Sequence, residues 1–130
     1  MHIFKRKIMA TVTINVAAYI NQAPSQVGNL SVSILHGAVR TFTGADFTTG
    51  LSPVYSDPEG DAPSKLKVQT LPTSGVLKLA GVAVVQNQEI LFSDIQAGSF
   101  TYHADAANNS AINTTFTFAM SDVGSGLFTS

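Results

Sequence analysis

Carboxylates crowded into one short stretch are the residues of this sequence best suited to chemistry. Three of the eight acidic residues, Asp57, Glu59 and Asp61, fall within five positions. Carboxylates at this spacing repel one another unless water or a shared cation separates them, and Ca²⁺ takes six to eight oxygen ligands from such loops. The same stretch holds the Pro and Gly of a turn, in which Asp commonly bonds to the backbone. A surface turn and a calcium loop therefore both remain open.

No catalytic centre is indicated. The histidines His2, His36 and His103 lie far apart in the sequence, and no nucleophile elbow, phosphate-binding glycine loop or His-Glu-x-x-His motif occurs. His103, Asp105 and a serine could be combined into a triad on paper, but almost any sequence of this composition allows that. We therefore expect a protein that is not an enzyme and requires no cofactor.

The composition favours one β-rich domain. The 130 residues are 45% hydrophobic and only 12% charged, without cysteine, and the net charge is −1. The one basic cluster is Lys5-Arg6-Lys7, so we expect no general attraction to nucleic acid or anionic membranes. No stretch approaches the roughly 20 apolar residues of a membrane span, so we expect no membrane insertion.

Short runs of alternating apolar and polar residues recur along the chain, as in antiparallel strands that are packed on one face. Turn residues such as Asp57-Pro58-Glu59-Gly60 and Ala80-Gly81 separate these runs. One helical turn is expected at Gly44–Phe47, with Phe47 tucked into the core. The expected strands include residues 30–34, 66–69, 77–79, 100–102 and 116–120.

The first 24 residues stand apart from this series. The segment Asn21–Ser25 interrupts the pattern with Pro and small polar residues, which divides the chain into residues 1–24, an N-terminal arm or extra strand, and a domain over residues 25–130. Residues 11–16 alternate Val12, Ile14 and Val16 with polar residues, as in a strand. Such a strand either completes its own sandwich or adds to a neighbouring molecule.

Two groups of motifs, read in order, resemble known repeats. The first is Tyr55-Ser56-Asp57-Pro58-Glu59-Gly60-Asp61 followed by Leu71–Leu77, which resembles the cadherin-like repeats of bacterial surface proteins. The second resembles the related repeats of chondroitin sulfate proteoglycans, through Phe92-Ser93-Asp94-Ile95, Gly98, Tyr102-His103, Phe116-Thr117-Phe118 and Asp122. The resemblance covers about residues 25–122.

The resemblance implies an antiparallel immunoglobulin/cadherin-like β-sandwich that acts as a spacer or adhesive unit, often with calcium between repeats. It makes Tyr102, Phe116 and Phe118 core residues and His103 a structural one. The candidate metal ligands are Asp57, Glu59, Asp61 and Asp122, and Asp105 could also join the loop.

Two departures weaken a calcium site. Thr114 stands where the family has Asp, and only one copy of the repeat is present. We therefore expect the domain to fold without calcium and to bind it weakly, at roughly 10⁻⁴–10⁻³ M.

For function, we expect a non-catalytic structural or decoration protein of a large assembly. The first interpretation is a bacteriophage virion, with the chain as a head or tail auxiliary protein that exposes its sandwich domain. The alternative is an adhesin module on a bacterial cell surface that binds carbohydrate or protein. In either setting the expected partners are other protein subunits, as a homo-oligomer or docked on a larger shell.

Overall fold

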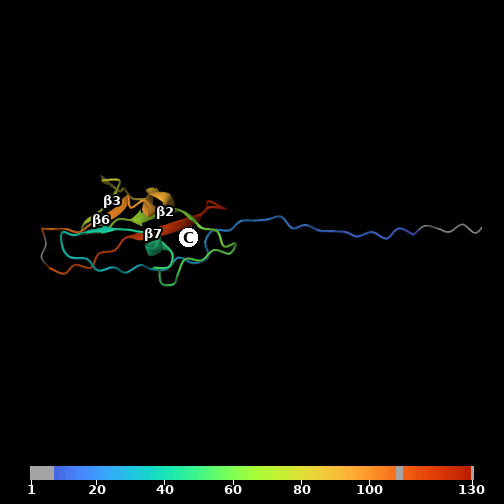
Figure 1. Ribbon diagram of the computed structural model, residues 1–130, viewed down its shortest axis with the longest axis horizontal. Helices are drawn as coiled ribbons and strands as arrows, with labels where there is room; N and C mark the ends of the chain where they lie inside the picture. The colour runs from blue at the N-terminus through green and yellow to red at the C-terminus, as the bar shows by residue number, and fades with distance from the viewer. Residues whose placement is uncertain (1–7, 108–109, 130) are drawn as a thin grey trace, which may run out of the picture.

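The alternating segments form two antiparallel sheets, and a long extended arm leads away from them (Figure 1). The structure is a computed structural model that describes residues 8–107 and 110–129; Lys5-Arg6-Lys7 and His2 lie outside them. One sheet has the order β1-β6-β3-β4 and the other β5-β2-β7. The strands are β1 (Val39–Thr41), β2 (Pro63–Thr70), β3 (Val76–Leu79), β4 (Val82–Ala83), β5 (Glu89–Leu91), β6 (Phe100–His103) and β7 (Thr117–Asp122). The predicted all-β sandwich is confirmed.

Strand β2 is the centre of the smaller sheet, because it pairs with β5 on one side and β7 on the other. Its inward side chains Leu66 and Val68 are fully buried, while Lys67 between them lies on the outer face. The Lys67 ammonium sits 4.4 Å from the centre of the Phe128 ring, a favourable cation–π contact. The period-two pattern therefore predicts this strand and its buried face correctly.

Five phenylalanines form the largest cluster of the core. The Phe42 ring stacks on Phe100 at 4.9 Å between centroids and lies 5.4 Å from Phe47. Phe47 in turn meets the edge of Phe118 at 5.2 Å, and Phe116 lies 6.0 Å from Phe42. Such tilted and edge-on pairs suit the charge distribution of aromatic rings. Rings from several separate segments thereby hold the two sheets together.

The turn that carries Phe47 has the predicted form. Ala45–Phe47 is a single 3₁₀ turn, η1, and Phe47 is completely buried. Asp46 fixes this turn to the sheet, since its carboxylate accepts a hydrogen bond from the Thr43 N–H and pairs with Arg40 at 2.7 Å. The expected helical turn at Gly44–Phe47 is confirmed.

Two expected strands are absent from the described chain. Residues 30–34 and residues 11–16 have no ladder partner and adopt no strand. Just before residue 30, Gln26 and Asn29 form only isolated bridges, to Ser56 and Ser52. An alternating sequence becomes a strand only when its backbone bonds to a neighbouring strand, and neither segment forms such a ladder with a described residue.

One short helix, α1 (Phe92–Gln96), was not expected from the strand pattern. It buries Phe92 and Ile95, three positions apart and so on one face of the turn. No helix in the described ranges is long and apolar enough to cross a membrane. The predicted core residues Tyr102, Phe116 and Phe118 are partly buried and pack against the central cluster.

We predict that Phe47→Ala will lower the free energy of unfolding by about 3–5 kcal/mol, because it removes a fully buried ring and leaves a cavity. Urea unfolding followed by circular dichroism measures this. Val85→Ala, at a side chain that is 64% exposed, is the control and should change stability by less than about 0.5 kcal/mol. A Phe47→Ala cost near that of the control would show that the cluster does not hold the sheets together.

We also predict that Gly75→Ala will be more costly than Gly81→Ala. Both glycines have positive φ, +76° and +80°, which costs any other residue about 1–2 kcal/mol. A Cβ on Gly75 would clash with the Tyr102 hydroxyl and the His103 carbonyl, whereas nothing lies within 4 Å of one on Gly81. The extra clash should add at least about 1 kcal/mol in urea unfolding. Equal costs for the two variants would contradict this packing.

Candidate functional site

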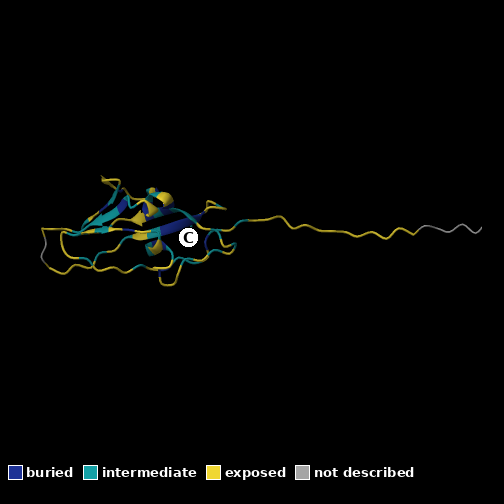
Figure 2. Ribbon diagram, viewed as in Figure 1, coloured by how far each residue is buried: buried dark blue, intermediate teal, exposed yellow. Residues whose placement is uncertain are grey.

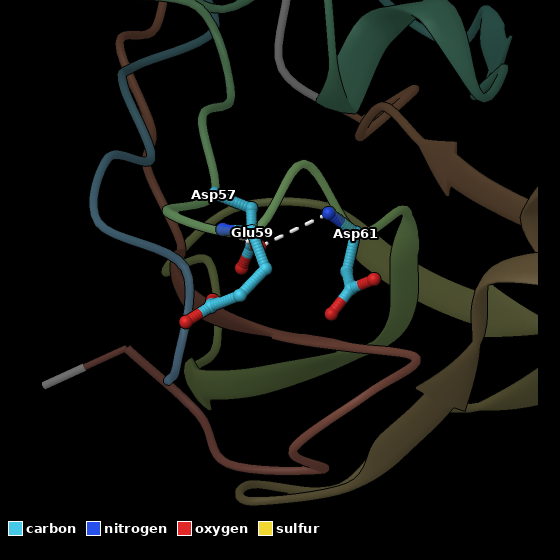
Figure 3. Close-up of side chains that lie close together, drawn as sticks. All are labelled: Asp57, Glu59 and Asp61. Carbon is cyan, nitrogen blue, oxygen red and sulfur yellow. Dashed lines mark hydrogen bonds between the residues drawn. The ribbon is translucent and has the colours of Figure 1, made fainter. Parts of the chain in front are cut away.

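The acidic loop is closed by its own first carboxylate. Asp57 Oδ1 accepts hydrogen bonds from the backbone N–H of Glu59 at 2.9 Å and of Asp61 at 3.0 Å (Figure 3). Gly60, at φ +80°, completes the turn with an N–H bond to the Asp57 carbonyl. The local bonds of a Pro/Gly turn therefore account for the shape of this loop.

The loop nevertheless gathers oxygen atoms that the protein leaves unsatisfied. Asp57, Glu59 and Asp61 can each offer one carboxylate oxygen, and these oxygens lie within 4.8 Å of one another. Asp57 Oδ2 and Glu59 Oε2 are buried and accept no hydrogen bond from the described residues. Asn21 Oδ1 is in the same state, beside Asp61, to which the Asn21 amide N–H donates. Three carboxylates thus bring oxygen ligands to one place, with the Asn21 amide beside them.

The negative charge of the loop affects two nearby phenols. Partial burial, and then the carboxylates of Asp57, Asp122 and Asp61, raise the pKa of Tyr55 above its ordinary value. The Tyr55 hydroxyl donates to the Asp61 carbonyl at 3.1 Å. Tyr19 at the base of the arm also has a raised pKa, first through desolvation and then through Asp61 and Glu59. The loop is a local centre of negative potential.

Asp122 lies close to the loop but is bound to the next turn. It is completely buried at the end of β7, and its carboxylate accepts hydrogen bonds from the Ser125 backbone N–H and hydroxyl. Burial alone raises the pKa of Asp122, but the hydrogen bonds from Ser125 and the Gly126 backbone outweigh it, and the net pKa is lowered. Asp122 therefore serves mainly to fix the turn after β7.

Asp105 lies at the opposite end of the sandwich. Asp122 pairs with Pro63 at the start of β2, a strand roughly 26 Å long. Asp105 follows Tyr102, whose hydroxyl donates at 2.8 Å to the carbonyl of Ser74, beyond the far end of β2. There the Asp105 carboxylate accepts a bond from the Ala107 N–H. Asp105 therefore cannot join the loop as a ligand.

The oxygen ligands at the loop suit a hard cation that binds with low affinity. Carboxylate and amide oxygens are the ligands that Ca²⁺ prefers, but it takes six to eight of them. The three carboxylates and Asn21 supply fewer, so water would fill the remaining positions. The arrangement fits a weak, partly hydrated calcium site on a turn that closes without metal.

A larger hollow lies away from the loop, beside β7. It has a volume of about 540 Å³ and lies between residues 24–29 on one side and Phe116–Phe118 with Thr129 on the other. Its lining contains no acidic, basic or histidine side chain. The sequence pattern does not reveal this hollow, because it depends on which side of β7 lacks a partner.

Comparison with protein-family models, curated proteins and solved structures finds no match to the chain. The resemblance to cadherin-like and proteoglycan repeats, and any likeness to immunoglobulin domains, therefore stay predictions. The structural role expected for His103 also stays a prediction. Its Nε2 lies 3.0 Å from the Thr101 hydroxyl on the same strand, within hydrogen-bonding distance.

We predict that a chelator will leave the Tm unchanged and that calcium will raise it only at millimolar concentration. With a dissociation constant near 10⁻³ M, 10 mM calcium adds about 1.4 kcal/mol, a rise of roughly 3–8 °C. Glu59→Gln should remove this rise and, without calcium, keep or gain stability because it relieves carboxylate repulsion. Glu89→Gln, on an exposed strand position, is the matched control. Scanning calorimetry measures each Tm.

Asp57→Ala is a poor test of calcium binding, because Asp57 also closes the loop through two backbone bonds. A large fall in Tm on chelation, or a rise that survives in Glu59→Gln, would contradict the weak site at this loop.

Proposed function

We propose that this protein is a non-catalytic structural subunit of a large protein assembly, attached to its neighbours by the N-terminal arm, residues 8–20. The observation that carries the proposal is the exposure of this arm (Figure 2). Its apolar side chains are 74–89% exposed: Ile8, Met9, Val12, Ile14, Val16, Tyr19 and Ile20. Apolar surface on this scale marks an interaction site in a soluble protein.

The rest of the described surface supports binding over chemistry. The larger hollow is lined by uncharged polar side chains, Pro24, Val27, Gly28 and two phenylalanines. The carboxylates that do lie together have a structural use, since Asp57 closes its loop and Asp122 fixes the following turn. The body of the protein is a packed scaffold from which a binding segment extends.

The assembly that we propose first is a bacteriophage virion, with the chain as a head or tail auxiliary protein and the sandwich displayed on the particle. An arm that pairs with neighbouring subunits suits a shell built from many copies, because each copy can be held by its neighbours.

The second candidate is an adhesin module on a bacterial cell surface that binds carbohydrate or protein. The acidic loop favours it, because unsatisfied oxygens at the base of the arm would suit a cation shared with an adjoining domain. Mass spectrometry and immunogold labelling of purified particles and of cell envelopes distinguish the two. Label on envelopes and never on particles would exclude the virion.

We predict that deletion of residues 1–20 will leave the free energy of unfolding within about 0.5 kcal/mol but abolish incorporation into the native assembly. The arm contributes little to the fold because its described side chains lie in solvent. Urea unfolding and the copy number per purified particle measure the two effects. Val82→Ser and Val123→Ser, at exposed apolar positions on the body, should incorporate normally. Normal incorporation of the truncated chain would overturn the proposed function.

A further inference from the structure

The aromatic core is not closed on the side of the hollow beside β7. Phe116 and Phe118 line that hollow and are only partly buried, although both belong to the phenylalanine cluster. Phe118 meets the buried Phe47 at 5.2 Å, and Phe116 lies 6.0 Å from the buried Phe42. The floor of the hollow is therefore an extension of the core and offers apolar contact to whatever enters it.

The outer edge of β7 is paired only near its C-terminal end, where Phe128 and Thr129 bond to Ser121 and Met120, and it is open at Phe118. The N–H and carbonyl of Val68 bond to Gln88 and Asn87, so the backbone of Val68 points away from β7. In an antiparallel pair its partner Phe118 must then also point outward, away from β2. Two residues on, the outward carbonyl of Met120 accepts a bond from the Thr129 N–H. By this geometry the N–H and carbonyl of Phe118 take no part in the ladder with β2, and within the described chain neither of them bonds to a residue outside the strands.

The wall formed by residues 24–29 also contains backbone groups without hydrogen-bond partners. Gln26 and Asn29 bond to the loop 52–56, whereas the backbone groups of Val27 and Gly28 between them make no hydrogen bond to any described residue. Two stretches of unpaired backbone therefore line one hollow with an apolar floor. This is the environment of a strand in a sandwich, with ladder bonds at its edges and alternate side chains directed inward.

The arm has the composition that such a strand needs. Val12, Ile14 and Val16 alternate with Thr11, Thr13 and Asn15, and the described arm forms no ladder of its own. A strand with one apolar and one polar face is matched to a site with core on one side and water on the other.

We propose that residues 11–16 of one copy enter the hollow beside β7 of a second copy as an added strand. This inference rests on the proposed function and names the partner of the arm. Val12, Ile14 and Val16 would cover Phe116 and Phe118, while the arm backbone bonds to the outward groups of Phe118. The threonines would remain in water.

The arm's course favours a second copy over its own body. The Asn21 side chain bonds to Asp61 where the arm begins, and from there the arm leads away from the sandwich (Figure 1). A return to its own hollow requires a reversal within residues 17–23. The other edge strands are poor acceptors, since β4 has two residues and β1 and β5 have three each, and short edges resist strand addition.

Disulfide trapping tests this, because the chain has no cysteine of its own. Full-length Thr13→Cys is mixed with full-length Thr117→Cys, an exposed position that lines the hollow, and oxidised mildly. Thr11→Cys and Asn15→Cys replace Thr13→Cys to sample the register. Val82→Cys on the edge of β4 replaces Thr117→Cys as the control. We expect mixed disulfides with Thr117→Cys at least about fivefold above those with Val82→Cys, identified by peptide mass spectrometry.

A second measurement does not depend on cysteine. Ile14→Asp should abolish self-association in sedimentation velocity, whereas Thr13→Asp, with the same charge on the outer face, should retain it. Equal trapping at Thr117 and Val82, equal behaviour of the two Asp variants, or a disulfide within one chain carrying both cysteines would each overturn the inference. If the arm is still required for incorporation in that case, the proposed function stands with a different acceptor.

Discussion

The structure depends on a cluster of phenylalanines that is buried except where it faces the hollow beside β7. Phe42, Phe47 and Phe100 are fully enclosed, while Phe116 and Phe118 reach the hollow beside β7. Strand β7 lies at the edge of its sheet and forms a ladder only with β2, and its other edge faces that hollow. Partly exposed rings next to unpaired backbone combine two features that proteins normally cover. In our proposal the exposed arm of one copy covers this open edge of another.

The arm leaves the sandwich at the end that carries the acidic loop. This end holds the carboxylates of the acidic loop together with Asn21 and the buried Asp122. The bond from Asn21 to Asp61 ties the base of the arm to the body at this loop. A cation at the loop would strengthen that tie without being needed for the fold. A hydrogen bond to a carboxylate therefore anchors the base of the arm. In our proposal, apolar contacts with a second copy hold its tip.

Local pattern predicts a good part of this structure. The alternation of apolar and polar residues identifies strands of the core. The short sequence spacing of three acidic residues identifies the carboxylates that lie together. What local pattern cannot supply is the pairing: residues 30–34 alternate as well as β2 does, yet have no neighbour to form a ladder. For the same reason the sequence groups Asp105 with the acidic loop, which lies at the opposite end of β2, and does not reveal the hollow beside β7. Both depend on which strand ends and edges meet, a property of the whole chain.

The most direct measurement of the central claim is amide hydrogen exchange of the full-length protein at low and at high concentration, resolved by residue. Val68 bonds within the sheet and should be protected at both concentrations. The account predicts that the Phe118 amide exchanges rapidly in dilute protein and becomes protected as concentration rises, because a second copy's arm then occupies the edge of β7. Rapid exchange of Phe118 at every concentration, or protection that is already complete in the monomer, would contradict it.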